Sequence, residues 1–121
     1  MSIVVMKFGG TSVADADRIR AAARRAIDTR RAGNQVVMVV SAMGGTTDRL
    51  VSLAAQITEA PPKREMDQLL ATGEQVTISL MAMAMEEMGC PAISFTAGQI
   101  GIVTDDVHTK AKIKSIDVRR L

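Results

Sequence analysis

Aromatic and sulfhydryl side chains are scarce in this sequence. It has no Trp or Tyr, and Phe8 and Phe95 are its only aromatic residues. The chain therefore lacks the stacking platforms that single-strand nucleic-acid binders use. Its one cysteine, Cys90, excludes an intrachain disulfide and a cysteine-based metal cluster, and such sparse cysteine usage is typical of a reducing cytosol.

The sequence also lacks a long apolar segment and a strong excess of charge of one sign. The most apolar later stretch, residues 76–85, is short and interrupted by Thr77 and Ser79, and the N-terminus has no basic region followed by an apolar one. We therefore predict a cytoplasmic protein without a membrane partner. The 15 basic and 13 acidic residues are spread along the chain, so we expect no nucleic-acid partner.

The composition and patterning that are present indicate one folded α/β domain, since 47% of the 121 residues are hydrophobic. Residues 3–6 and 36–40 are unbroken apolar runs, which are typical of strands buried on both faces of a parallel sheet. Between them, residues 14–31 carry apolar side chains at helical spacing, with acidic residues early and basic residues late. Strand, helix and strand in this order predict a right-handed crossover.

Two more helices are predicted after the second strand. The first covers residues 48–58 and ends before a pair of prolines, and the second covers residues 64–87. We expect one face of the second helix to be buried through Leu69, Leu70, Val76, Leu80, Met83 and Ala84. Gly73 lies inside this helix and lowers its stability by roughly 1 kcal/mol relative to alanine, so we expect a packing or ligand reason for it.

The remaining residues are predicted to form short strands. Residues 92–95 predict a third buried strand, and residues 100–103 and 111–116 predict shorter strands around turns. A further element begins at Val118. His108, the only histidine, and the neighbouring acidic pair Asp105 and Asp106 fall in a polar turn, where we expect solvated side chains rather than a metal site.

Two loops rich in small residues follow the first two predicted strands. Residues 7–12 (KFGGTS) and 41–47 (SAMGGTT) both lie at the carboxyl ends of strands, where open α/β sheets bind ligands, so we expect the loops to converge. Glycine N–H groups, hydroxyls and helix N-termini suit carboxylates or phosphates, and Lys7 would add a point charge. Each loop taken singly is also compatible with a simple tight connection, and Lys7 with a solvated strand end.

The dipeptide Gly73-Glu74 is a third candidate feature. A glutamate within a largely apolar helix can accept hydrogen bonds from a substrate ammonium group if it faces the crevice, and otherwise points to solvent. The sequence has neither GxxxxGK[ST] nor GxGxxG, so a nucleotide would be held in another way.

Four segments resemble, in order and spacing, successive signatures of bacterial aspartate kinases, which belong to the amino-acid kinase superfamily. They are residues 7–15 (KFGGTSVAD), 40–48 (VSAMGGTTD), 69–74 (LLATGE) and 94–99 (SFTAGQ). The resemblance covers essentially the whole chain, and KFGGTS is highly specific to this branch. It implies a three-layer α/β/α fold with a mainly parallel sheet.

The activity implied by this resemblance is phosphorylation of the side-chain carboxylate of L-aspartate by ATP with Mg²⁺. The product is 4-phospho-L-aspartate, the first step toward lysine, threonine and methionine. By the same resemblance, Lys7 stabilises the transferred phosphoryl group and Glu74 receives the substrate ammonium group. Thr47 contacts aspartate, and the residues that face phosphate are Gly9, Gly10, Thr11, Ser12, Ser41 and Gly44. No metal ligand is expected among these residues.

Aspartate kinases continue well beyond the matched segments. Residues 1–121 would be the N-terminal, substrate-side part, without the nucleotide-binding half or the ACT regulatory domains. We therefore expect this chain alone to be inactive, and to form homo-oligomers or to pair with the missing kinase half. Two alternatives remain open: a kinase for another amino acid such as glutamate, against which KFGGTS and Gly73-Glu74 argue, and a non-catalytic binding module.

Overall fold

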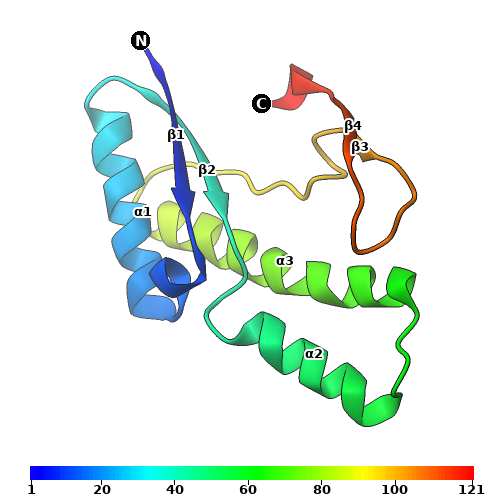
Figure 1. The fold of residues 1–121 in the computed structure, drawn as a ribbon. Helices are drawn as coiled ribbons and strands as arrows, with labels where there is room; N and C mark the ends of the chain where they lie inside the picture. Colours follow the sequence, from blue (N-terminus) through cyan, green and yellow to red (C-terminus); the bar gives the residue numbers. More distant parts are fainter.

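A computed structural model describes all 121 residues (Figure 1). Its elements are β1 (Ile3–Phe8), the 3₁₀ helix η1 (Gly10–Val13), α1 (Ala16–Arg31), β2 (Gln35–Val40), α2 (Thr46–Ile57), α3 (Lys63–Glu87), β3 (Ile102–Thr104), β4 (Ile113–Ile116) and the 3₁₀ helix η2 (Val118–Arg120). No helix combines the length and the apolar character needed to cross a membrane.

Strands β1 and β2 pair in parallel, with Ile3 opposite Gln35 and Phe8 opposite Val40. The connecting helix α1 has the ends that the sequence predicts. The Asp15 carboxylate caps its N-terminus by accepting a hydrogen bond from the Arg18 N–H at 2.9 Å, and basic residues occupy its last turn. The predicted strand, helix and strand are therefore confirmed.

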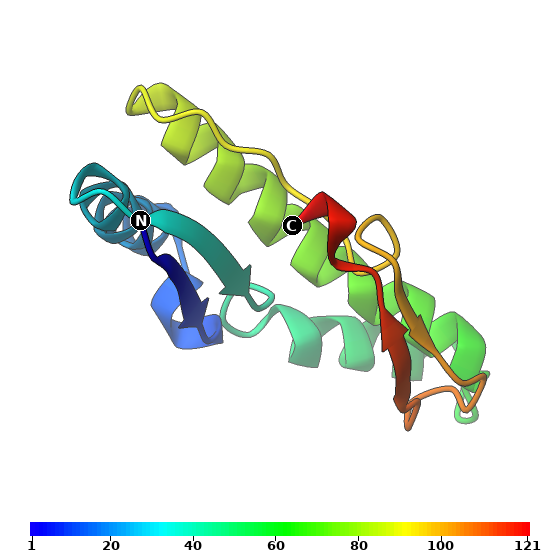
Figure 2. The same ribbon diagram turned by 90° about the horizontal axis from the view of Figure 1, so that it is seen from above.

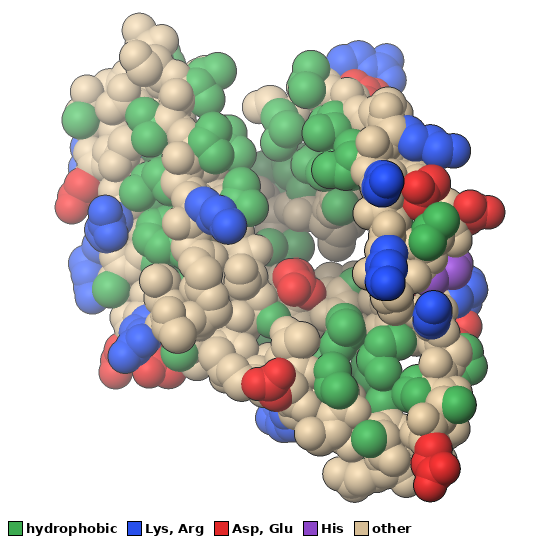
Figure 3. Space-filling model, viewed as in Figure 1, with side chains coloured by type: hydrophobic (Ala, Val, Ile, Leu, Met, Phe, Trp, Pro, Cys, Tyr) green, Lys and Arg blue, Asp and Glu red, His purple; other side chains and the backbone are tan.

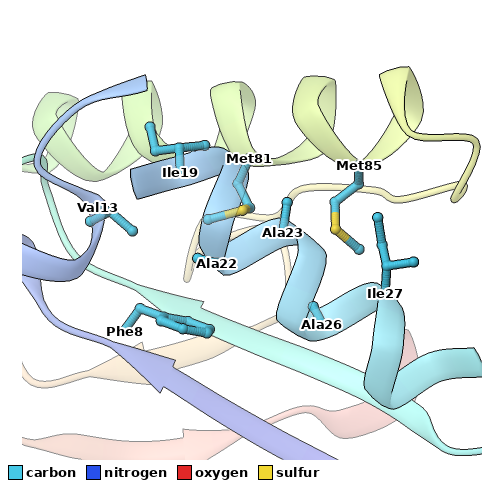
Figure 4. Close-up of a cluster of buried hydrophobic side chains, with 9 residues drawn as sticks. All are labelled: Phe8, Val13, Ile19, Ala22, Ala23, Ala26, Ile27, Met81 and Met85. Atoms are coloured by element: carbon cyan, nitrogen blue, oxygen red, sulfur yellow. The ribbon is translucent and has the colours of Figure 1, made fainter. Parts of the chain in front are cut away.

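The hydrophobic core lies where α1 and α3 pack against each other and against one face of this sheet (Figure 4). Alanines dominate the α1 side, and their small side chains let the two helices and the sheet approach closely. The nine buried members are Phe8, Val13, Ile19, Ala22, Ala23, Ala26, Ile27, Met81 and Met85.

The other face of the sheet is uncovered, which corrects the prediction of strands buried on both faces. Ile3, Val5 and Val39 are 66%, 64% and 47% exposed, whereas the alternate residues of β1 face the core. The physical reason is the number of layers: residues 1–121 place helices against only one face of this sheet. In the space-filling view, hydrophobic side chains gather on both sides of the central hollow (Figure 3).

Helix α3 buries a different face from the predicted one. Its buried residues follow one row at i, i+4 spacing, namely Gly73, Thr77, Met81 and Met85. Val76, Leu80 and Met83 are 50%, 39% and 64% exposed, so their predicted burial is wrong. The buried row begins with the small residues Gly73 and Thr77, which let α3 approach its neighbouring segments closely. The close packing along this row outweighs the larger apolar area of the face that carries Val76, Leu80 and Met83.

Residues 92–95 are not a strand, contrary to the prediction. The segment runs along α3 (Figure 2), and Ala92 donates its N–H to the Glu86 carboxylate at 3.0 Å instead of joining a ladder. It has no neighbouring strand to pair with, so strand-forming side chains alone do not make it a strand. Beyond it, β3 and β4 form a separate antiparallel pair.

The element predicted from Val118 onward is the short helix η2. The Asp117 carboxylate caps η2 and accepts hydrogen bonds from the guanidinium and the backbone N–H of Arg119. Both hydrogen bonds lower the pKa of the Asp117 carboxyl, and the bond from the guanidinium has the larger effect.

Candidate functional site

A cleft of about 470 Å³ lies at the carboxyl ends of β1 and β2. There the two glycine-containing loops meet the N-terminus of α2 and the middle of α3. It is open to solvent and is lined by Gly10, Thr11, Ser41, Ala42, Met43, Gly44, Gly45, Thr47, Asp48 and Glu74. The predicted convergence of the two loops is therefore confirmed.

The loops approach each other closely because glycines lie where they meet. A Cβ atom built on Gly10 would lie 3.1 Å from the carbonyl oxygen of Ala42, and one built on Gly44 would lie 3.1 Å from the Ala14 Cβ. Both distances are tighter than ordinary van der Waals contact. Side chains at these positions would push the loops apart and widen the cleft.

The N-terminus of α2 supplies unpaired backbone donors to the cleft. Gly45, in the left-handed region at φ 75°, is the N-cap and offers no side chain to accept a hydrogen bond. The Thr46 N–H donates to the Met43 carbonyl at 3.0 Å, whereas the N–H groups of Thr47 and Asp48 have no acceptor within the chain. Free N–H groups and the helix dipole together favour an anionic group at this end of the cleft.

Gly73 brings the third component of the site into place. A Cβ on Gly73 would lie 2.9 Å from the Ala42 Cβ and 3.3 Å from the Thr46 Cγ2, so α3 rests directly on the loop that precedes α2. This contact is the packing reason for a glycine inside the helix. It places the following residue, Glu74, at the rim of the same cleft.

The charges of the cleft are arranged unevenly. Two carboxylates, those of Asp48 and Glu74, line it, and no lysine or arginine does. An ammonium group would find acceptors at these carboxylates, and a carboxylate or phosphate would find donors at the start of α2 and at the hydroxyls of Thr11, Ser41 and Thr47. The cleft therefore suits a small ligand that carries both charges.

Most of the residues identified from the sequence lie in this cleft: Gly10, Thr11, Ser41, Gly44, Thr47 and Glu74. Gly9 and Lys7 lie outside it, and the Lys7 side chain is exposed on the uncovered face of β1. Ser12 lines a separate hollow of about 150 Å³ together with Phe8 and Arg18.

Asp48 is the one charged residue of the cleft that sequence reasoning left without a role. It lies in the first turn of α2, where an acidic side chain is expected simply to stabilise the helix dipole. Its position one residue after Thr47 is the signal that points to the cleft.

The chain contains no group of three His, Cys, Asp or Glu residues placed to hold a metal ion by themselves. Mg²⁺ commonly binds through one or two carboxylates together with substrate phosphates, and the Asp48 carboxylate is compatible with that mode. The unpaired N–H groups and hydroxyls of the cleft fit phosphate oxygens, so these residues are compatible with a nucleotide phosphate chain and its metal.

Comparison with known proteins identifies the family of the chain. The family model described as the amino acid kinase family matches residues 2–121. An aspartokinase of Mycolicibacterium smegmatis is 54% identical over 121 residues, which is 100% of this chain and 29% of that protein. Aspartokinase 2 of Bacillus subtilis is 57% identical over 117 residues, which is 97% of this chain and 29% of that protein.

A solved structure shows the same fold. A crystal structure of an aspartate kinase from Synechocystis matches with a TM-score of 0.80 and 56% sequence identity, covering 84% of this chain and 17% of that one. The chain belongs to the amino acid kinase family, and its α/β class is confirmed. It spans 29% of the length of the curated aspartokinases that it resembles.

Replacement of Gly73 by alanine tests the packing that builds the cleft. Helix propensity alone favours alanine by about 1 kcal/mol. We expect the opposite result, a loss of about 1–3 kcal/mol in the free energy of unfolding, because the new Cβ would collide with Ala42. Urea-induced unfolding of the wild type and of the Gly73→Ala chain measures this difference in the free energy of unfolding.

Gln75→Ala is the matched control, since Gln75 is an exposed residue of the same helix. It should leave the free energy of unfolding nearly unchanged. A Gly73→Ala chain that is more stable than the wild type would show that the contact between α3 and the loop is not tight.

Proposed function

We propose that this chain is the N-terminal, aspartate-binding part of an aspartate kinase. The observation that carries the proposal is the meeting of Glu74 with the open N-terminus of α2 in one cleft. The names and identities of the aspartokinase relatives support the choice of aspartate among amino acids. The reaction would be transfer of the γ-phosphoryl group of ATP to the aspartate side-chain carboxylate, which gives 4-phospho-L-aspartate.

The proposed roles follow from the charges of the cleft. Glu74 receives the ammonium group of aspartate, and Thr47 with the start of α2 receives a carboxylate. Gly10, Thr11, Ser41 and Gly44 face the phosphate groups from the cleft. Gly9 and Ser12 of the first loop do not line the cleft, and their proposed phosphate-facing role rests on the resemblance alone. Phosphoryl transfer depends mainly on positioning and on neutralising charge, and backbone donors that are held rigidly meet both needs.

Lys7 is proposed to stabilise the phosphoryl group during transfer. Lys7 lies in β1 three residues before Gly10, which lines the cleft, but Lys7 itself does not line it. The cleft contains no lysine or arginine of its own. A nucleotide with several negative charges therefore requires a cation from its border, together with the Mg²⁺ that it brings, which would neutralise phosphate charge.

The remainder of the enzyme is proposed to lie outside these residues. We propose that the adenine-binding half of the kinase domain and the ACT regulatory domains are supplied by segments outside these residues. The proposed setting is the cytoplasm, and the pathway is the one that leads to lysine, threonine and methionine. Association with a second copy or with the missing kinase half would bury the exposed apolar side chains of the sheet and of α3.

The first test uses the chain alone. We expect calorimetry to detect binding of L-aspartate but not productive binding of ATP with Mg²⁺. Hydroxamate trapping should detect no phosphoaspartate, because the proposed adenine-binding half would be needed to position ATP for transfer. Light scattering should show dimers or larger species. Aspartate-dependent turnover by a monomer would contradict the proposal that these residues form only the aspartate-binding part of the enzyme. Binding of glutamate in preference to aspartate would show that the proposed substrate is wrong.

A Glu74→Gln substitution tests the ammonium site. The background is a chimera in which this chain replaces the matching 117 residues of Bacillus subtilis aspartokinase 2. We expect the KM for aspartate to rise about tenfold or more while the KM for ATP stays unchanged, because one charge-assisted hydrogen bond is lost. Glu87→Gln, at the far end of the same helix, is the control. Equal weakening of both substrates would place Glu74 in another role.

A Lys7→Ala substitution in the same chimera tests the phosphoryl-facing cation. We expect kcat to fall about a hundredfold or more with little change in the KM for aspartate, because the lysine acts on charge that develops during transfer. Lys114→Ala, an exposed lysine of β4, is the matched control. A change confined to KM would assign Lys7 to ground-state binding instead.

A further inference from the structure

The polar contacts between the C-terminal part of the chain and the preceding residues all involve one side chain, that of Asp67. Every hydrogen bond and ion pair that joins residues 93–121 to residues 1–92 ends on the Asp67 carboxylate of α3. The Thr109 N–H donates to both carboxylate oxygens, at 3.1 Å and 3.0 Å, and the His108 Nδ1 lies 3.0 Å from Oδ2. These partners are 41 and 42 residues away in sequence.

The loop between β3 and β4 is shaped around this carboxylate. Thr109 is the only non-glycine residue with a positive φ, at 66°, a region that β-branched side chains disfavour. Such conformations persist where several contacts hold them. Within the loop, the Asp105 carboxylate accepts hydrogen bonds from the N–H groups of Val107 and Lys112, which fixes the base of the turn.

Asp67 is also aligned with the proposed substrate site. It precedes Glu74 by seven residues on α3, and this spacing places the two carboxylates on the same side of the helix, about 10 Å apart along its axis. The β3–β4 hairpin stands over α3 (Figures 1 and 2). The helix that presents Glu74 to the cleft therefore also carries the hairpin.

We infer that Asp67 is a positioning residue, which fastens the β3–β4 hairpin to α3 and thereby holds the Glu74 side of the cleft in place. A carboxylate suits this task because its two oxygens accept from a backbone N–H and an imidazole at once. The effect on substrate rests on the function proposed above, whereas the fastening of the hairpin does not.

Hydrogen exchange on residues 1–121 tests the fastening directly. In Asp67→Ala, the amides of Thr109 and of β3 and β4 should exchange about tenfold faster or more, because hydrogen bonds to a charged group are lost. His108→Ala keeps both Thr109 bonds and should have a smaller effect. Gln68→Ala, at the exposed neighbouring position of α3, should match the wild type. The inference would be overturned if amides of β3 and β4 exchanged at the same rate in Asp67→Ala as in Gln68→Ala. It would also be overturned if exchange in Asp67→Ala were faster by the same factor along the whole of α3.

Kinetics of the chimera test the consequence for the site. Asp67→Ala should raise the KM for aspartate several-fold while kcat and the KM for ATP change less, and Asp67→Asn, which retains one acceptor oxygen, should recover part of the loss. A KM for aspartate equal to that of Gln68→Ala would overturn the link between hairpin and cleft. Absence of activity in the unsubstituted chimera would instead reject the proposed function, while the exchange result would still decide whether Asp67 fastens the hairpin.

Discussion

The contact of Gly73 with Ala42 and Thr46 is the constraint on which the candidate site depends. A missing side chain at this position lets α3 rest on the loop after β2, and the loop in turn touches Gly10 of the loop after β1. Three segments from different parts of the chain therefore meet with almost no side-chain volume between them. A cleft built in this way exposes backbone N–H groups instead of covering them, and that exposure is the property an anion requires.

Helix α3 connects this constraint to the rest of the molecule. Its C-terminal half packs Met81 and Met85 against α1, its middle presents Glu74 to the cleft, and Asp67 near its N-terminus accepts the hydrogen bonds of the hairpin. One helix makes all three contacts. The core, the cleft and the hairpin are therefore joined through α3 although they lie far apart in sequence.

The charge distribution of the cleft complements an amino acid better than it complements a nucleotide. Two carboxylates and the start of α2 complement a zwitterionic amino acid, while no cation lines the cleft. Under the proposed function, these 121 residues would recognise an amino acid, whereas the charge of a nucleotide would be neutralised by groups outside the cleft lining. This imbalance agrees with a chain that spans 29% of the length of its aspartokinase relatives.

The sequence by itself determined the local elements and the general location of the site. Asp15, the late arginines and the apolar runs specify α1, β1 and β2 through capping and periodicity, and parallel pairing then requires the two loops to meet at one edge. Tertiary structure alone decided which face of α3 is buried, because a close approach at Gly73 and Thr77 outweighed the apolar pattern of Val76, Leu80 and Met83. It also decided that residues 92–95 form no strand, that Asp48 lines the cleft and that Asp67 meets His108 and Thr109. These outcomes depend on partners that are distant in sequence, and neither periodicity nor local propensity specifies such partners.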